Sequence, residues 1–374
     1  MPSAVYVHIP FCRIRCPYCD FDAYRAPRRA IEGHSGALLA EIASRRHELR
    51  PVTSLYFGGG TPTTAGVAGL RAVIDVLRAA PGILPDAEVT VEANPTPRDA
   101  AAFAELRDMG VTRVSLGVQS LTDRLLPMLG RDHTAAEAAD AVRQALRLGL
   151  EVSLDLMCGV PGQGMADWLA DLEAAVALVP GHISVYMLTL EAGTRYERLH
   201  AGGRLELPDE DEQADMYEAA LERLGRAGYE HYEVSNLALP GRQSRHNRVY
   251  WENREYSGFG AGASSCVSGR RWTNESHPTA YAEAVRSGVR KPSLLERLPP
   301  ERSMRETLAL GLRLLEGVDL ITVRERYGAE RLARVLPVLE GLAARGLVTL
   351  AGRAALTRRG LMLYDGVAAE ILAP

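Results

Sequence analysis

Three cysteines near the start of the chain have a spacing that suits a metal cluster. Cys12, Cys16 and Cys19 follow the pattern C-x3-C-x2-C. Iron–sulfur clusters are normally held by four cysteine thiolates, so three thiolates hold only three irons of a four-iron cubane. The remaining iron is then open to a small molecule. The spacing therefore predicts a [4Fe–4S] cluster with one iron free to bind a ligand.

A zinc site is the alternative interpretation of the same cysteines. Structural zinc takes four protein ligands, often from paired C-x2-C units. His8 or Asp20 could complete such a set here. The two other cysteines, Cys158 and Cys266, each stand alone, and we expect them to be small core residues.

Glycine and polar residues recur directly after apolar segments further along the chain. Gly58-Gly59-Gly60-Thr61-Pro62 follows one such segment, and consecutive glycines let a ligand approach backbone N–H groups closely. A phosphate site is the alternative, although the run lacks the lysine of a P-loop. Other residues at or after the ends of apolar segments are Glu92, Gln119, Arg131, Asp155 and the run Gly159–Gln163. Five such loops at one face of a barrel would form a binding site.

The first apolar segment has the alternation of a β-strand. Val5, Val7 and Ile9 fall on one face, and Tyr6 and His8 on the other. In a parallel barrel we expect the aliphatic side chains to lie under helices and Tyr6 and His8 to point inward. The cysteines would then follow the carboxyl end of the strand, where barrel enzymes build their active sites.

Strands and helices alternate after the cysteines, which is typical of a parallel sheet with helical crossovers. The predicted strands are Ser3–Ile9, Thr53–Phe57, Glu88–Glu92, Thr112–Leu116, Glu151–Leu156 and His182–Leu188. The predicted helices between them are Ser35–Arg50, Gly66–Ala80, Pro97–Met109, Thr134–Leu148 and Met165–Val179. Six strands are too few for a closed eight-stranded barrel. We therefore predict an α/β fold built on a partial (β/α)6 TIM-like barrel.

The rest of the chain predicts two further parts. A helix over Asp209–Ala227 and a strand over Tyr229–Leu237 end the first domain, residues 1–240. Residues 241–298 form a connecting segment, with a boundary near Gly288–Pro300. Three helices, a hairpin around Gly352-Arg353 and a last helix then predict a winged-helix-like α+β module over 299–374.

Composition and charge exclude several classes of protein. The chain has 374 residues, 47% hydrophobic and 24% charged, with a formal net charge of −4. This balance gives no electrostatic case for nucleic acid or anionic membrane, and no apolar run is long enough to span a bilayer. An odd number of cysteines, three of them crowded together, does not suit a disulfide framework. We expect a cytoplasmic protein.

Together these residues resemble the radical S-adenosylmethionine (SAM) family of oxygen-independent coproporphyrinogen III oxidase. The motifs are Tyr6-Val-His-Ile-Pro-Phe-Cys12, the cysteine spacing, Phe57-Gly-Gly-Gly-Thr-Pro62, Glu92, Gly117-Val-Gln-Ser120 and Asp155 with Gly159-Val-Pro161. The resemblance spans most of residues 4–270 and extends to the terminal module. It implies a radical SAM barrel with SAM on the open iron. The positions that it assigns to SAM binding are Tyr6, Tyr18, Gly59, Gly60, Thr61, Glu92, Gln119, Arg131 and Asp155.

Within that family the chain is similar to the HemW-type heme chaperone branch rather than to the oxidase. The oxidase has a fourth cysteine where this chain has Phe21, and a long N-terminal extension where only eleven residues precede Cys12. Residues His246 to Trp251 carry the branch's H-N-x-x-Y-W signature. The resemblance implies that the chain binds heme and transfers it to an acceptor protein, which the sequence does not name. Transient docking to an acceptor in a membrane stays open.

Histidine is a common heme ligand, so we expect His246 to bind heme with Tyr250 and Trp251 against the ring. The alternative is that the aromatic turn merely seals the barrel mouth. Other candidate ligands are His8, His133, His231 and Cys266. Whether the protein is also an enzyme is left open: the alternative function is a radical SAM oxidative decarboxylase of coproporphyrinogen III.

Overall fold

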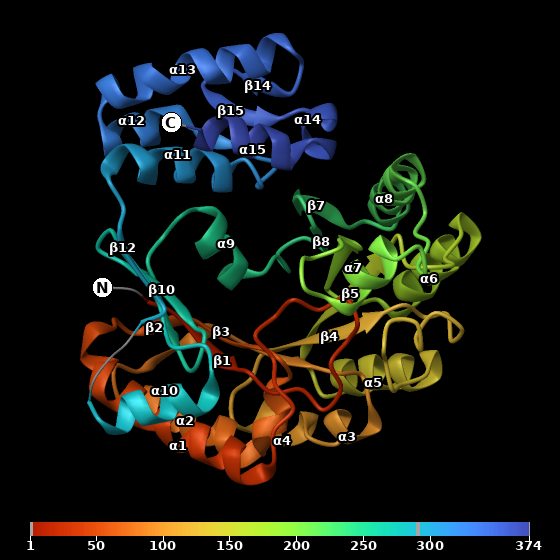
Figure 1. Cartoon of the computed structure of the whole chain (residues 1–374), viewed down its shortest axis with the longest axis vertical. Helices are drawn as coiled ribbons and strands as arrows, with labels where there is room; N and C mark the ends of the chain where they lie inside the picture. Colours follow the sequence, from red (N-terminus) through yellow and green to blue (C-terminus); the bar gives the residue numbers. More distant parts are fainter. Residues whose placement is uncertain (1–2, 289–291, 374) are drawn as a thin grey trace.

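The computed structural model describes residues 3–288 and 292–373, and its main feature is one large twisted sheet. The strand order is β12-β11-β10-β9-β1-β2-β3-β4-β5-β6-β8-β7 (Figure 1). Its centre is a series of parallel strands in chain order: β1 (Ala4–Ile9), β2 (Val52–Gly59), β3 (Ile83–Ala93), β4 (Arg113–Gln119), β5 (Glu151–Cys158) and β6 (His182–Met187). These are the six predicted strands, and the predicted partial (β/α)6 barrel is confirmed.

The predicted crossover helices are present, with shifted ends. They are α1 (Arg28–Arg45), α2 (Gly66–Ala79), α3 (Pro97–Ala100), α4 (Phe103–Asp108), α5 (Ala135–Arg147) and α6 (Met165–Leu178). Two short 3-10 turns, Arg46–Glu48 and Pro62–Ala65, flank β2. The helix expected over 97–109 is divided, and only its first turn has a side-chain cap, from Thr96. Thr134 and Glu137 form a capping box that fixes the start of α5.

The outward face of β1 packs as its alternation predicts. Val5, Val7 and Ile9 are fully buried in the core cluster that also holds Leu38 and Ile42 of α1. Tyr6 faces the barrel interior, where its ring stacks on that of Tyr56. The cysteine loop therefore leaves β1 at the carboxyl end of the barrel.

Further strands extend the sheet on both sides. After α7 (Arg195–Ala201) and α8 (Glu210–Arg226), the strand expected over 229–237 is a hairpin of β7 (Glu230–Glu233) and β8 (Asn236–Ala238). Within 241–298, β9 (Tyr256–Phe259) pairs with β1 in parallel and is a seventh parallel strand. An antiparallel extension follows: β10 (Ser264–Val267), β11 (Arg270–Thr273) and β12 (Leu294–Arg297). The connecting segment thus completes the sheet, and it also contains α9 (Arg245–Trp251) and α10 (Pro278–Arg286).

The last part of the chain has its own core. Its helices are α11 (Pro300–Gly311), α12 (Leu320–Tyr327), α13 (Ala329–Ala344), α14 (Arg358–Met362) and α15 (Tyr364–Leu372). A small sheet joins β13 (Val318–Asp319), β15 (Arg353–Leu356) and β14 (Val348–Leu350) in that order. Three helices followed by a hairpin are the order that the sequence predicts, but the single last helix that it predicts is divided into α14 and α15. Figure 1 shows this module beyond α9, on the opposite side of the sheet from α1 and α2.

Candidate cofactor-binding site

The interior of the barrel is polar and leaves a cavity of about 370 Å³. TIM barrels usually fill this space with Val, Ile and Leu side chains. Here the inward positions of β3 to β6 carry short or charged side chains instead: Thr90, Glu92, Ser115, Ser153, Asp155 and Ser184. These side chains cannot form an apolar core, so the cavity is suited to a polar ligand.

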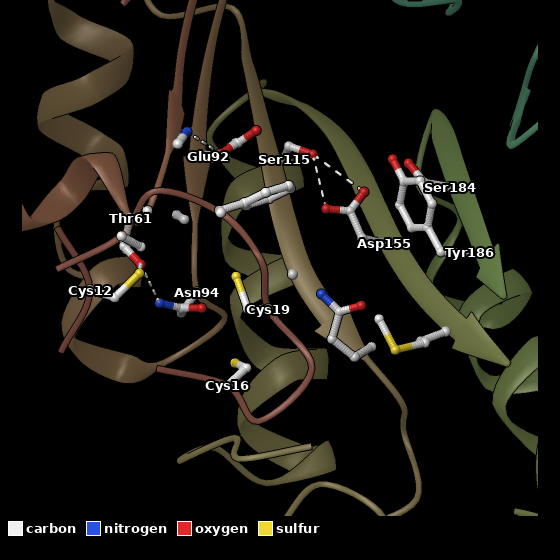
Figure 2. Close-up of a pocket in the computed structure, with 18 of the residues that line it drawn as sticks. Cys12, Cys16, Cys19, Thr61, Glu92, Asn94, Ser115, Asp155, Ser184 and Tyr186 are labelled. Atoms are coloured by element: carbon white, nitrogen blue, oxygen red, sulfur yellow. Dashed lines mark hydrogen bonds between the residues drawn. The ribbon is translucent and has the colours of Figure 1, made fainter. Parts of the chain in front are cut away.

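The three cysteines line one side of this cavity. Cys12, Cys16 and Cys19 are free thiols on the loop after β1. Figure 2 shows them on the same side of the cavity as Thr61 and Asn94, with Asp155 and Tyr186 across from them. The Cys12 thiol lies 3.6 Å from the Thr61 hydroxyl, which receives a hydrogen bond from the Asn94 amide at 3.2 Å. The structure thus brings all three predicted cluster ligands to one ligand-sized space.

The two side chains considered as a fourth zinc ligand lie in different surroundings. His8 is buried, with its Nδ1 2.9 Å from the Tyr6 hydroxyl and its Nε2 3.4 Å from the carbonyl oxygen of Asp22. Burial lowers the pKa of His8. One ring nitrogen therefore contacts the end of the cysteine loop and the other contacts Tyr6 of β1. Asp20 is exposed at the mouth of the cavity.

The glycine run is required by the packing of the chain itself. A Cβ at Gly59 would lie 2.5 Å from the His8 ring, and one at Gly60 would lie 2.6 Å from the carbonyl oxygen of Phe11. Gly59 also has a φ of +112°, which favours glycine. The sequence interpretation gave these glycines to ligand approach alone. The structure adds a packing reason for glycine at these positions: without a Cβ, they let His8 and the start of the cysteine loop lie against the end of β2.

Two carboxylates face the cavity from the predicted strand ends. Glu92 accepts hydrogen bonds from the Tyr56 hydroxyl at 2.8 Å and from the N–H of Gly59 at 3.1 Å. Burial raises the pKa of Glu92 to about 7, limited by the Tyr56 hydrogen bond and increased by the charge of Asp155. Burial also raises the pKa of Asp155 to about 6, against hydrogen bonds from Ser184 and Ser115. Both groups can gain or lose a proton near neutral pH.

Arg131 and Gln119 bring unpaired polar atoms to the same cavity. The Arg131 guanidinium donates to the Asn94 amide oxygen and to the Tyr18 hydroxyl, each at 2.9 Å. Its Nε and the Gln119 Oε1 are buried without a hydrogen-bond partner in the described part of the chain. Gln119 is also held at a φ of +67°, an uncommon conformation for a side chain of this size. Unpaired buried polar atoms are costly unless a ligand or water satisfies them.

The sequence missed several lining residues. Asn94 follows Glu92 by two positions, so the strand-end rule could have found it. Ser153, Ser184 and Tyr186 lie inside strands that read as apolar runs, and only the barrel geometry shows which of their side chains face inward.

Comparisons with known proteins identify the family. Residues 6–175 match the model of the Radical SAM superfamily, and residues 298–363 match that of the HemN C-terminal domain. The heme chaperone HemW of Mycobacterium tuberculosis is 38% identical over 99% of this chain and 95% of its own. That of Synechocystis is 38% identical over 92% and 86%. The chain belongs to the HemW family.

The structural comparison supports the fold. The structure of coproporphyrinogen III oxidase (HemN) from Escherichia coli superposes with a TM-score of 0.86 over 99% of this chain and 90% of that chain, at 21% identity. At this identity the likeness shows a shared fold. Among the described residues, no helix is long and apolar enough to span a membrane.

The H-N-x-x-Y-W signature of the HemW branch lies on α9, and its histidine points into the barrel. His246 is 1% exposed, with its Nδ1 3.0 Å from the Ser54 hydroxyl and its Nε2 3.0 Å from the Tyr250 hydroxyl. Its ring stacks on Tyr56 at 5.2 Å, and burial lowers its pKa to about 3. Both nitrogens are occupied and no face of the ring is open. This geometry does not fit the predicted heme ligand and favours the alternative, in which the segment seals the barrel.

The aromatic residues of the signature are also engaged inside the protein. Tyr250 packs edge-on against both His246 and Tyr256. The Trp251 ring lies under the guanidinium of Arg313, 4.3 Å from the ring centre, and Arg313 forms a 3.1 Å ion pair with buried Glu233. In this HemW-family chain the signature therefore joins the barrel to the C-terminal module.

The other candidate heme ligands lie outside the described lining of the cavity. His133 is buried with its Nε2 3.3 Å from the carbonyl of Val118, and burial, with a contribution from Arg131, lowers its pKa to about 4. His231 lies 3.4 Å from the carbonyl of Val234. Cys266 is on β10, opposite Arg271 of β11.

Proposed function

We propose that the protein is a heme chaperone that carries a [4Fe–4S] cluster and SAM, binds heme and transfers it to an acceptor protein. The observation that carries the proposal is a cavity lined by three free cysteines and by unpaired polar atoms, in a full-length relative of proteins named heme chaperone HemW. Cys12, Cys16 and Cys19 would hold three irons. The fourth iron would be left to SAM.

The SAM-binding residues are the nine that the sequence predicts: Tyr6, Tyr18, Gly59, Gly60, Thr61, Glu92, Gln119, Arg131 and Asp155. Eight of them line the cavity directly. Tyr6 does not line the cavity and contacts His8 through its hydroxyl, while Gly59 also donates its N–H to Glu92. A SAM molecule has an ammonium group, a carboxylate and ribose hydroxyls, and these match a set of two acids, one arginine and one amide. A bound cluster would supply the electron for reductive chemistry on SAM.

We also propose a separate role for each of the three parts of the chain. Residues 1–240 would hold the cluster and SAM, 241–298 complete the sheet and anchor the signature, and 299–374 would dock the acceptor. We place the protein in the cytoplasm, because free cysteines at an oxygen-sensitive cluster suit a reducing compartment.

The test uses the full chain, reconstituted anaerobically with iron and sulfide. Hemin is titrated while the Soret band is followed, and the loaded protein is mixed with apomyoglobin as a heme sink. We expect saturable hemin uptake and transfer to the sink. In parallel, the reduced protein is incubated with SAM and coproporphyrinogen III. Protoporphyrinogen formation, or absence of hemin uptake, would overturn the chaperone proposal.

A further inference from the structure

A second and larger hollow lies outside the barrel, on one face of β10 to β12. It is a groove of about 990 Å³. Its floor is made by Val267, Trp272 and Leu295, from three neighbouring strands in which Trp272 and Leu295 are paired across β11 and β12. Its walls are α1 and α10, which pack side by side (Figure 1). The volume is near the upper end of the roughly 300–1,000 Å³ typical of small-molecule sites.

Two arginines lie next to each other at one end of this groove. Arg270 and Arg297 are direct cross-strand partners and both line it. Like charges placed opposite each other destabilise a sheet. Within residues 3–288 and 292–373, neither guanidinium has an ion pair or hydrogen bond that would offset this cost. The pair is therefore ready to bind two acidic groups.

A third arginine, at the end of α1, also lines the groove. Arg45 is 2% exposed, and its Nη1 donates to Glu41 at 2.7 Å and to the carbonyl of Gly258 at 2.9 Å. Its guanidinium lies 5.2 Å from the centre of the Trp272 ring. The Arg45 Nη2 and the Trp272 Nε1 are both buried with no partner in the described structure. These two donors are a second, independent sign that something else completes the groove.

We infer that this groove is the heme-binding site of the protein. The inference rests on the proposed function, since it names the surface that holds the heme. A flat apolar ring with two carboxylates matches a floor of Trp272 and Leu295 that ends in a pair of free arginines. Three acids line the groove. Glu41 and Glu48 form ion pairs with Arg45, and Glu275 accepts a hydrogen bond from the N–H of His277 at 3.2 Å, so the described contacts of these acids lie away from the arginine pair.

The groove would hold heme by its ring and propionates, leaving the iron for another protein. Among the described lining residues there is no histidine, cysteine or methionine. Tyr281 is present, but its hydroxyl donates to Glu41 at 2.7 Å. Recognition without an iron ligand suits a carrier, because the acceptor can bind the iron while the carrier still holds the porphyrin edge.

The first experiment needs no variant. Hemin, metal-free protoporphyrin IX and hemin dimethyl ester are titrated into the full-length protein, with Trp272 among the fluorophores quenched. We expect hemin and protoporphyrin IX to bind within about threefold of each other, and the ester roughly tenfold or more weakly, because charge-assisted hydrogen bonds to the arginines are lost. Equal binding of the ester, or loss of binding without iron, would overturn the site. If hemin itself fails to bind, it is the proposed function that fails.

The second experiment uses charge reversal. Arg270→Glu with Arg297→Glu should weaken hemin binding by roughly tenfold or more, while Arg270→Lys with Arg297→Lys retains most of it. The matched control is Arg71→Glu with Arg98→Glu, two exposed arginines on α2 and α3. SAM affinity should be unchanged in all of these proteins and reports that they are folded. Wild-type hemin affinity in the Arg270→Glu/Arg297→Glu protein with normal SAM binding would contradict the inference.

Discussion

The cavity inside the barrel and the groove on its outer side differ in every property that selects a ligand. The cavity is enclosed by parallel strands and lined by acids, amides and hydroxyls, with three thiols at its mouth. The groove lies on an antiparallel extension of the same sheet and combines an aromatic and aliphatic floor with free arginines. One sheet thus carries two separate sites: the cavity suits a small zwitterion such as SAM, and the groove suits a flat dianion such as heme.

This separation explains how one chain could hold two chemically different cofactors without competition. The parallel strands bring polar side chains together at their carboxyl ends, which is the usual place for chemistry in a barrel. The antiparallel strands β10 to β12 add a surface that α1 and α10 border at the groove. If the two regions act independently, changes in one should leave ligand binding at the other intact.

The largest effect is expected at the cysteines. Replacing Cys12, Cys16 or Cys19 with alanine should abolish the visible cluster chromophore after anaerobic reconstitution, because two thiolates cannot hold the cubane. Hemin affinity should remain, since the groove is built from other strands. Iron, sulfide and zinc are measured per protein, with Cys158→Ala as the control because Cys158 is buried and apart from the loop. Full iron content in all three variants, or stoichiometric zinc in the wild type, would contradict the assignment.

A smaller loss is expected from Gly60→Ala. The new Cβ would lie 2.6 Å from the Phe11 carbonyl oxygen, so the cysteine loop must shift. Overpacking of this kind costs roughly 1–3 kcal/mol, and we expect reduced iron loading together with weaker SAM binding. Gly33→Ala is the matched control, because a Cβ there meets nothing within 4 Å. Equal iron content in the two variants would show that the loop tolerates the shift.

The barrel and its strand-end residues could be predicted from the sequence, whereas the groove could not. Glu92 and Asp155 follow short apolar runs, so their place at the cavity follows from the parallel topology alone. Arg270 and Arg297 are far apart in the chain and become neighbours only through the pairing of β11 with β12. The contacts of His246 could not be predicted for a similar reason: the spacing of its motif shows a short helix with aromatics but not that the ring enters the barrel.

A pH dependence should appear at the cavity and not at the groove. The pKa of Glu92 is raised to about 7 in the free protein, so its carboxylate is charged above that pH and neutral below it. If it pairs with the SAM ammonium, SAM affinity should fall by up to about tenfold per pH unit below 7. Glu92→Gln should give weak binding with a flatter profile. Calorimetry at roughly pH 6, 7 and 8, the range around that pKa, measures both proteins. An identical slope in the Gln variant would remove Glu92 from SAM recognition.

The smallest effect on ligand binding is expected from His246. Because both of its ring nitrogens are hydrogen-bonded inside the barrel, His246→Ala should bind hemin with wild-type affinity and an unchanged Soret band. The cost should instead appear in folding: loss of the buried ring and of two hydrogen bonds destabilises by roughly 2–4 kcal/mol, measured by urea unfolding. His200→Ala, at an exposed histidine, is the control.

The stability of the His246 variant should also depend on pH in a way that heme ligation would not produce. The folded-state pKa of about 3 lies below the ordinary value of 6.5, so the unfolded chain binds a proton first as the pH falls. The wild type should therefore lose up to about 1.4 kcal/mol per pH unit from this residue below pH 6.5. His246→Gln removes that loss, and its stability deficit should shrink as the pH is lowered. A shifted Soret band in His246→Ala, with the deficit constant across pH, would return His246 to the heme site and remove the separation between barrel and groove.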